Sequence, residues 1–472
     1  MMNDEGIPLV YCVTPRTEKA MPSDFPEEPF LGLDDVEAHT TRLLGMKPSA
    51  SMKSSAKRFY PGDVLYSRLR PYLNKVWLAD RSGLCSSEFI VLPSNEHLDG
   101  GFLKYRLSAM DFVSFANSLN AGDRPRVDFD QISSFCIPPF SLARQRRIVA
   151  KIEELFSELE AGEESLRLAR RQFATYRQSL LKQAFENKLT QTWRTQNPDK
   201  LESPASLTAA IDARSRNANF RAKEDHEIPS WAYRTLDELT ESVTSGSRGW
   251  ADYYAESGSV FIRAQNLNQD FLNLADIAYV RLPDSAEGKR TRVKYGDLLI
   301  TITGANTTKA GWVSTKLDEA YVSQHVALCR PISDALSLFL YRYIVAEAGG
   351  RKKLTTDAYG AGKPGLNLDN VRSLTVPLPP LPEQHEIVRL LDEQFEVIER
   401  NEREIDAALQ RSEALRQSIL HRAFTGRLVP QNPADEPTSE LLARLRAEKA
   451  RATTEASGKK PRNRRLASLP KK

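Results

Sequence analysis

The sequence predicts two globular units of mixed α/β (α+β) structure, joined by two long antiparallel α-helices that form a coiled coil, with an internal pseudo-twofold repeat. Three observations predict this architecture: a long internal repeat, heptads of apolar residues within it, and a β-rich segment ahead of each copy. A chain of 472 residues has the length of roughly three domains at about 150 residues each. Each globular unit therefore has enough residues to bury a core of its own.

The internal repeat is the strongest of these signals. A shift of 239 residues aligns 125–189 with 364–428 without a gap, and about twenty of the 65 pairs are identical. The clearest correspondence joins residues 177–181 (RQSLL) to residues 416–420 (RQSIL). Similarity over this length indicates that the chain consists of two copies of one plan.

Each copy of the repeat predicts a long helix. Apolar residues recur every three or four positions from Ile148 in the first copy and from Ile387 in the second. More than five heptads without an internal proline are typical of a coiled coil, and proline-rich leads place the helix starts just beyond them. We therefore expect helices at about 143–187 and 383–425. Antiparallel pairing is expected because it gives the molecule a pseudo-twofold axis and places the two globular units at opposite ends.

The repeat also sets the expected domain boundaries. The expected segments are a first globular unit at 1–136, a central helical region at 137–228, a second globular unit at 229–376, a C-terminal helical region with a further short helix at 377–450, and a basic tail at 451–472 that we expect to be disordered. A single amphipathic helix would pack against almost any apolar surface. Two helices in the same register, each following an equivalent globular unit, favour each other as partners.

The first globular unit carries a basic segment interleaved with aromatic residues. Between Lys53 and Lys75 it holds six Lys/Arg and three tyrosines against one acid, Asp63, a composition that suits phosphates and base edges. Arg68 and Arg70 alternate, so they are predicted to project from one face of a strand. The predicted DNA-contacting residues of this unit are Lys57, Arg58, Arg68, Arg70, Tyr72, Asn74, Lys75, Arg124 and Arg126.

The second globular unit is polar rather than basic at corresponding places. Gln, Asn and Arg side chains have the geometry for bidentate hydrogen bonds to adenine or guanine. Any one of them is equally consistent with an ordinary solvated loop, and the prediction rests on the whole set. The predicted DNA-contacting residues of this unit are Ser247, Arg248, Trp250, Arg263, Gln265, Asn266, Asn306, Thr307, Lys309, Gln324, His325 and Lys363.

Composition excludes several other classes of protein. The four cysteines are scattered without Cys-x-x-Cys spacing, which predicts neither a metal site nor a disulfide framework. No apolar run is long enough to span a membrane and no secretory signal precedes the chain, so we expect a cytoplasmic location and no membrane partner. The net charge of +4 is concentrated at the C-terminus, where residues 443–472 hold eleven Lys/Arg against two acids. Net charge alone therefore does not predict nucleic-acid binding.

Motifs for catalysis are weak or missing. Residues 360–365 fit G-x-G-x-x-G, yet a proline and an expected extended segment at 366–369 follow where a nucleotide-binding loop needs a helix. Residues 283–289 resemble a metal-nuclease signature, but its acids are crowded into one turn. Neither His325 nor His385 has an acidic residue at a sequence spacing that would indicate a catalytic pair. With no P-loop, nucleophile elbow or Asn-Pro-Pro-aromatic motif, we expect no catalytic residue in this chain.

Taken together, the motifs resemble the specificity subunits of type I restriction-modification systems over nearly the whole chain. The resemblance rests on two unlike globular units, each followed by a proline-led helix. Each helix has Gln-x-x-Ile-Val near its start and Arg-Gln-Ser-[Leu/Ile]-Leu and Ala-Phe near its end. Residues 378–384 and 423–428 match this pattern closely. The first copy departs from it at 140–145 and 186–189 without breaking the register.

The resemblance implies a division of labour. Each globular unit would be a target recognition domain that reads one half of a bipartite, asymmetric site in double-stranded DNA, and the helices would set the spacer. Two modification (methyltransferase) subunits would dock on the helices and bring S-adenosylmethionine for adenine N6 methylation, and restriction subunits would add chemistry that uses ATP and Mg²⁺. This chain itself would be non-catalytic and would bind no cofactor.

Two other classes of function stay open at this point. One is a type II-like nuclease or methyltransferase system with a fused recognition part, which the missing motifs disfavour. The other is a coiled-coil scaffold without a DNA role, which leaves the Arg, Asn, Gln and aromatic residues of both units unexplained. The bases read and the spacer length cannot be named, because several side chains and DNA shape can each select one base pair.

Overall fold

The computed structural model describes residues 6–120, 122–213, 219–222, 228–283, 289–360 and 364–457. These residues form two compact units. Unit 1 combines Met1–Leu166 with Asp406–Lys472, and unit 2 is Arg167–Ile405. Each unit therefore contains one globular domain and a part of both long helices.

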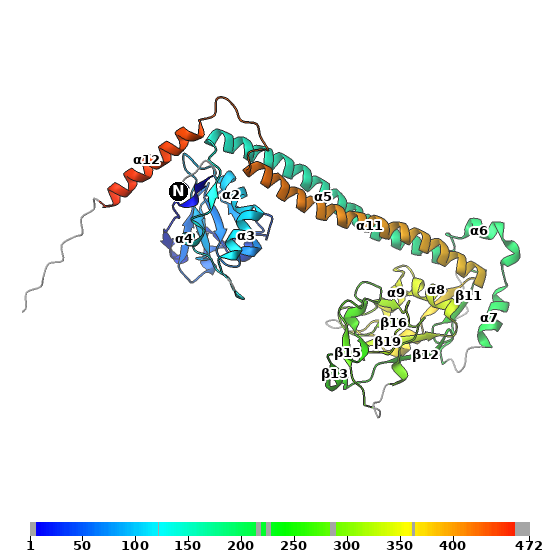
Figure 1. Cartoon of the computed structure of the whole chain (residues 1–472). Helices are drawn as coiled ribbons and strands as arrows, with labels where there is room; N and C mark the ends of the chain where they lie inside the picture. The colour runs from blue at the N-terminus through cyan, green and yellow to red at the C-terminus, as the bar shows by residue number, and fades with distance from the viewer. Residues whose placement is uncertain are drawn as a thin grey trace, which may run out of the picture. The chain divides into compact units, whose positions relative to one another are not determined.

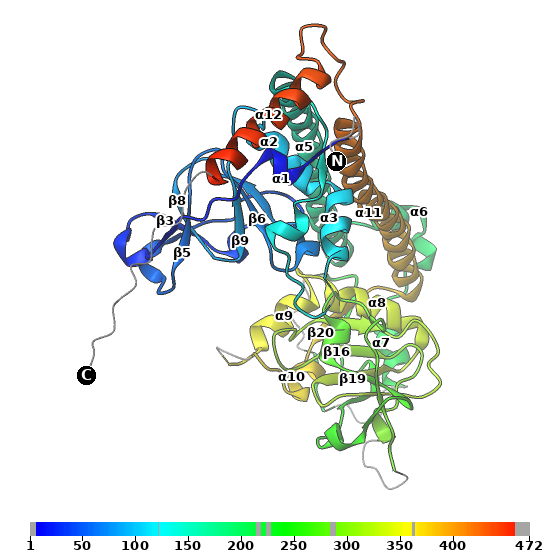
Figure 2. The same cartoon turned by 60° about the vertical axis from the view of Figure 1, so that its left-hand side comes forward.

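The described residues of unit 1 form three sheets, with strand orders β2-β5-β8-β3-β4, β7-β6-β9 and β1-β10. Figure 2 labels β3, β5 and β8 of the first sheet and β6 and β9 of the second. The strands of this unit are β1 Ile7–Pro8, β2 Lys19–Ala20, β3 Pro29–Leu31, β4 Lys47–Pro48, β5 Ala56–Phe59, β6 Val64–Ser67, β7 Val76–Leu78, β8 Gly83–Cys85, β9 Phe89–Leu92 and β10 Cys136–Ile137. Its short helices are α1 Leu9–Cys12, α2 Gly100–Ser108, α3 Met110–Ser118 and α4 Phe129–Ile132.

Strand β6 is buried on both of its faces. Val64 and Tyr66 belong to the apolar cluster that includes helix α2, whereas Leu65 faces a second cluster with Phe89 and Val91. Successive side chains of a strand point to opposite faces, so a run of consecutive apolar residues is what a strand between two cores requires.

The described residues of unit 2 form sheets ordered β12-β19-β16-β17, β13-β15-β14-β18 and β11-β20. Its strands are β11 Ala232–Thr235, β12 Thr240–Ser245, β13 Tyr254–Ala255, β14 Ser259–Ile262, β15 Ala278–Val280, β16 Leu298–Thr301, β17 Ala310–Trp312, β18 Ala320–Val322, β19 Val326–Pro331 and β20 Thr375–Leu378. Its shorter helices are α6 Gln191–Gln196, α7 Pro204–Asp212, α8 Asp334–Val345, α9 Gly350–Asp357 and α10 Leu368–Arg372. In β16, Leu298 and Ile300 face one apolar cluster and Leu299 faces another, as in β6.

The two long helices are α5 (Leu142–Phe185) and α11 (Leu381–Phe424), each of 44 residues. Both ends of each helix lie within two residues of the expected positions. In both units the two helices lie side by side (Figure 1). In unit 1, Glu163 of α5 pairs with Arg416 of α11 at 3.2 Å, and in unit 2, Arg177 pairs with Glu402 at 3.2 Å.

The C-terminal segment of unit 1 packs beside the N-terminal strand. Helix α12 (Thr438–Ser457) contributes Leu441 and Leu445 to a cluster with Ile7 of β1. Asp435, just before this helix, pairs with Arg147 of α5 at 2.6 Å. The expected boundary at residue 451 is wrong, because α12 continues through Ser457. Residues 458–472 of the predicted tail lie outside the described residues.

Candidate nucleic-acid interface

In unit 1, the chain leaving strand β6 meets a segment that is distant in sequence. Leu69 forms an antiparallel bridge with Arg126, and the Arg70 N–H donates a hydrogen bond to the Pro125 carbonyl at 2.8 Å. We call this meeting place the first junction, which comprises residues 67–75, 86–89 and 124–127. The fold thus joins the basic segment predicted from the sequence to the arginines at the start of the repeat.

Four arginines gather at the first junction: Arg68, Arg70, Arg124 and Arg126. Arg70 and Arg124 are exposed to solvent. Arg68 and Arg126 are each paired with a carboxylate of unit 1, although the Arg126 side chain keeps 57% of its surface exposed. Guanidinium groups that reach solvent on one surface are the groups that phosphate and guanine select.

Arg68 and Arg70 do not extend a strand. Strand β6 ends at Ser67, and Arg70 adopts a left-handed backbone with φ of 52° just before Pro71. Proline has no N–H for a sheet ladder and disfavours a helical residue ahead of it, so the chain turns here. The prediction that both arginines project from one face of a strand is therefore wrong. The turn leaves Tyr72 with 41% of its surface exposed.

Four other predicted contacts of unit 1 bind within the fold: Lys57, Arg58, Asn74 and Lys75. The Lys57 ammonium donates to a backbone carbonyl at 2.6 Å, and burial lowers its pKa. Asn74 is 3% exposed and Lys75 donates to a backbone carbonyl at 2.7 Å. Arg58 pairs with Glu28 at 2.8 Å. These side chains stabilise the domain, so the structure does not support them as DNA contacts.

The corresponding place in unit 2 has the same backbone arrangement. Thr303 forms an antiparallel bridge with Gly365, and the Gly304 N–H donates to the Pro364 carbonyl at 3.2 Å. We call it the second junction, which comprises residues 301–309, 323–326 and 364–366.

The two junctions share a pattern of backbone hydrogen bonds. In the first junction, backbone N–H groups donate to carbonyls from Ser67 to Lys75 (3.0 Å), Arg68 to Glu88 (2.9 Å), Arg70 to Pro125 (2.8 Å) and Val127 to Arg68 (3.0 Å). In the second junction, the corresponding bonds run, in the same order, from Thr301 to Lys309 (2.8 Å), Ile302 to His325 (2.9 Å), Gly304 to Pro364 (3.2 Å) and Leu366 to Ile302 (2.8 Å). Because these bonds join main-chain atoms, the same scaffold can carry different side chains.

Amide and imidazole side chains surround the second junction. Gln324 and His325 are exposed on the turn that begins strand β19. A Cβ on Gly246 would lie 2.1 Å from the Val322 carbonyl, so only glycine lets the loop after β12 approach this turn. That loop carries the half-buried Ser247 and the exposed Arg248. The Asn306 amide donates a hydrogen bond to the Ala264 carbonyl at 3.5 Å, and the residue that follows Ala264 is the exposed Gln265.

Several predicted contacts of unit 2 serve the domain instead. Trp250 is 4% exposed and packs against Phe261 and Tyr321, so it is a core residue. Asn266 is 3% exposed and holds the turn that follows β14. The remaining predicted residues are also engaged: Arg263 with Asp276 (3.2 Å), Lys309 with Asp270 (2.8 Å) and the Thr307 hydroxyl with the Pro364 carbonyl (2.8 Å). The predicted contact Lys363 lies outside the described residues.

Sequence reasoning missed Tyr359. Its ring is 62% exposed, and its backbone pairs with Gly365 through two hydrogen bonds of 2.9 Å, which places it at the second junction. The available signal was an aromatic residue directly ahead of a glycine-rich loop. For that loop the sequence predicted a DNA contact through Lys363 and not through the tyrosine ahead of it. An exposed aromatic ring next to amide side chains is a surface on which a sugar or base can pack.

The glycine-rich loop itself is described only in part. Residues 361–363 lie outside the described residues. The expected extended segment at 366–369 is wrong for 368–369, where α10 begins, while Asn367 has an extended backbone. This helix has five residues, and its cap, Asn367, binds its own first turn. The acids of the nuclease-like segment at 283–289 fall on residues that are not described.

Chemistry elsewhere in the described residues is sparse. Within the described ranges, no group of three or more His, Cys, Asp or Glu is placed to hold a metal ion. Burial raises the pKa of the Cys85 thiol to about 12, which keeps it protonated near neutral pH. No described helix is long and apolar enough to cross a membrane.

Comparison with known proteins finds a family model and several relatives that match this chain. Residues 230–411 match the family model of the type I restriction modification DNA specificity domain. The specificity subunit of the type I restriction enzyme EcoDI of Escherichia coli is 30% identical over 196 residues, which cover 40% of this chain and 43% of that protein. The EcoKI specificity subunit of Escherichia coli strain K12 is 25% identical over 386 residues, covering 79% of this chain and 76% of that protein.

A solved structure extends the similarity of fold. A chain from a study of complex assembly and conformational transition in a type I restriction-modification system superposes with a TM-score of 0.64 at 20% identity, covering 89% of this chain and 97% of that one. Residues 230–411 thus form a type I restriction-modification specificity domain. The resemblance seen in the sequence is confirmed for this segment by the family model, and the chain is similar to specificity subunits of type I restriction enzymes over a longer stretch. The chain spans 43% of the length of the first of these relatives and 66% of the EcoBI specificity subunit of Escherichia coli.

Proposed function

We propose that this chain is the DNA-specificity subunit of a type I restriction-modification complex and that each junction reads one half of a bipartite, asymmetric DNA site. The observation that carries the proposal is the shared pattern of backbone hydrogen bonds, on which the two units display different polar side chains. Arginines suit phosphates and guanine in one unit, and amides suit adenine in the other. Unlike side chains on a like scaffold are what two different half-sites require.

We also propose that the two units are copies of one plan and that α5 and α11 form an antiparallel coiled coil. Their equal lengths of 44 residues and the alignment of both helix starts and both helix ends by the 239-residue shift support this proposal. A rod of this kind would fix the separation of the half-sites, because a helix rises by about 1.5 Å per residue.

Catalysis and cofactors belong, in this proposal, to partner subunits. Two modification subunits would bind the helical region and bring S-adenosylmethionine for adenine N6 methylation. Restriction subunits would bring ATP and Mg²⁺ for translocation and cleavage of the DNA. The chain would work in the cytoplasm of a prokaryote. A type II-like recognition part is not favoured, since the relatives are specificity subunits of type I enzymes.

A binding assay tests the proposal. Purified chain, together with a modification subunit from the same organism, is mixed with a pool of duplexes that carry random sequence, and bound DNA is sequenced. We expect enrichment of two short sequences separated by a spacer of fixed length. With labelled S-adenosylmethionine, the chain alone should transfer no methyl group. Enrichment of a single continuous site, or methylation by the pure chain, would contradict the proposal.

A further inference from the structure

A glutamine near the end of α5 contacts the backbone of the neighbouring domain. Gln178 accepts a hydrogen bond from the Glu347 N–H at 2.9 Å and donates one to the Val345 carbonyl at 3.3 Å. Val345 is the last residue of α8, where the helix leaves carbonyl groups without partners in the helix. One amide side chain therefore completes the end of a helix that belongs to the second globular domain.

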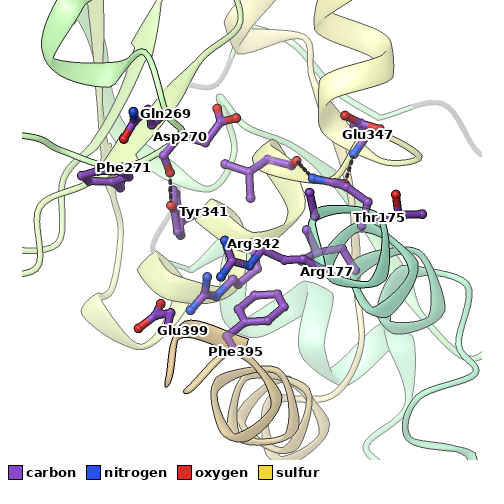
Figure 3. A pocket seen from close by; sticks show the side chains of 14 residues that line it. Thr175, Arg177, Gln269, Asp270, Phe271, Tyr341, Arg342, Glu347, Phe395 and Glu399 are labelled. Carbon is purple, nitrogen blue, oxygen red and sulfur yellow. Dashed lines mark hydrogen bonds between the residues drawn. The ribbon is translucent and has the colours of Figure 1, made fainter. Parts of the chain in front are cut away.

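The arginine beside this glutamine reinforces the same contact. The Arg177 guanidinium lies over the Phe395 ring of α11 at 5.4 Å, and Arg342 of α8 lies over the same ring at 4.6 Å (Figure 3). Arg342 also pairs with Asp392 of α11 at 2.7 Å. Arg177, Arg342 and Phe395 line a cavity of about 520 Å³. Helix α8 is thus held to both long helices at one place.

Unit 1 has a similar joint, built from the other long helix, in which the bond from a backbone N–H to the glutamine recurs. Gln417 of α11 accepts a hydrogen bond from the Met110 N–H at 3.1 Å, at the start of α3. The preceding residue, Arg416, lies over the Phe156 ring at 5.0 Å and pairs with Glu163 at 3.2 Å. The repeated Arg-Gln of the two sequence copies therefore makes equivalent contacts in the two units.

The chemistry of the joint explains why one motif serves two unlike domains. Each glutamine binds main-chain N–H or C=O groups, which every sequence provides, rather than particular side chains. The joint can therefore be retained while the domain attached to it changes. Its hydrogen bonds of 2.9 to 3.3 Å join the glutamines to backbone groups at helix termini. Because hydrogen bonds are directional and apolar packing is not, these bonds restrict the orientation of the domain on the helices.

We propose that Gln178 and Gln417, each supported by the preceding arginine, are positioning residues that fix the orientation of each reading domain on the helix pair. They thereby restrict the spacer lengths that the protein accepts. This inference rests on the proposed function. It predicts that loosening one joint changes the tolerance for spacer length and leaves unchanged the bases read within either half-site.

The test measures binding of the chain, assembled with its methyltransferase, to duplexes that hold the two half-sites at the preferred spacer and at spacers one and two base pairs shorter or longer. Gln178→Ala should lower discrimination against wrong spacers by about two- to tenfold, the range expected from one or two lost hydrogen bonds. Gln178→Glu keeps the acceptor for Glu347 and should give an intermediate result. The matched controls are Gln172→Ala and Gln410→Ala, exposed glutamines on the same two helices.

The outcomes separate the two proposals. Equal loss of affinity at every spacer in Gln178→Ala, with discrimination retained, would show a role in stability alone and overturn the inference. The same holds if Gln178→Glu folds normally by thermal unfolding and discriminates as the unmodified protein does. If the unmodified protein itself accepts all spacers equally, then the proposed function fails first. Gln417→Ala should repeat the result of Gln178→Ala at the other joint.

Discussion

The two junctions differ in their side chains and agree in their backbone. The first presents arginines and Tyr72, whereas the second presents Gln324, His325 and Tyr359. Their matched backbone hydrogen bonds differ in length by at most a few tenths of an ångström. The comparison teaches that a main-chain scaffold can be conserved within one molecule while the chemistry it displays is exchanged. It also predicts that the two junctions can be altered independently.

The largest expected effect comes from lengthening both helices together. One heptad inserted between Leu166 and Arg167, and another between Ile405 and Asp406, keeps the apolar register while adding about 10 Å of helix. On DNA with about 10 base pairs per 34 to 36 Å, we expect the preferred spacer to grow by about three base pairs. Methylation mapping in cells would show unchanged half-sites at the new spacing. If the methylated sites had different half-site bases at the original spacing, the prediction that the helices set the spacer and the junctions read the bases would be contradicted.

A double substitution tests the first junction alone. Arg70→Ala with Arg124→Ala removes the two exposed guanidinium groups, at about 1–3 kcal/mol for each good base contact. We expect relaxed selection at one half-site, and a lower dependence of binding on salt if a phosphate is also lost. Lys57→Met is the control, because Lys57 binds a backbone carbonyl inside the domain and should affect stability only. Unchanged selection at both half-sites would remove these arginines from the interface.

Gly246→Ala tests the second junction through its backbone. The added Cβ would lie 2.1 Å from the Val322 carbonyl, so the loop that carries Ser247 and Arg248 must move away from the turn. Overpacking of this kind costs about 1–3 kcal/mol. We expect weaker binding and weaker selection of bases only in the half-site that the second junction is proposed to read. Gly45→Ala is the control, since a Cβ there has open space around it.

The smallest expected effect is at the exposed ring of the second junction. Tyr359→Ala should cost about 1 kcal/mol if the ring packs against DNA, a typical value for an aromatic contact. Tyr359→Phe keeps the ring and should restore binding. Tyr295→Ala, an exposed tyrosine outside both junctions, serves as the comparison. Binding by Tyr359→Ala equal to that of the unmodified protein would show that the second junction reads DNA through its amides without this ring.

Helix α5 and the first junction show how far prediction reached. The heptads and the proline-rich leads located the ends of α5 to within two residues, because helical periodicity and proline stereochemistry act over a few neighbouring residues. Of the predicted DNA contacts of unit 1, Arg70 and Arg124 are exposed to solvent, whereas Lys57 and Asn74 bind within the domain. Contact of Arg70 and Arg124 with DNA stays a prediction. Composition indicates which segment is basic, but it does not indicate which side chains of that segment face inward.

The sequence by itself determined the internal repeat, the two long helices and the mixed α/β character of the globular units. These features are patterns of residues close together in the chain. Only the tertiary structure decided that Leu69 meets Arg126, that Trp250 is a core residue and that Gln178 completes the end of α8. Each of these depends on hydrogen bonds or packing between segments that are distant in sequence. Such contacts form only when the sheets and helices have assembled, so the local periodicity of the sequence does not predict them.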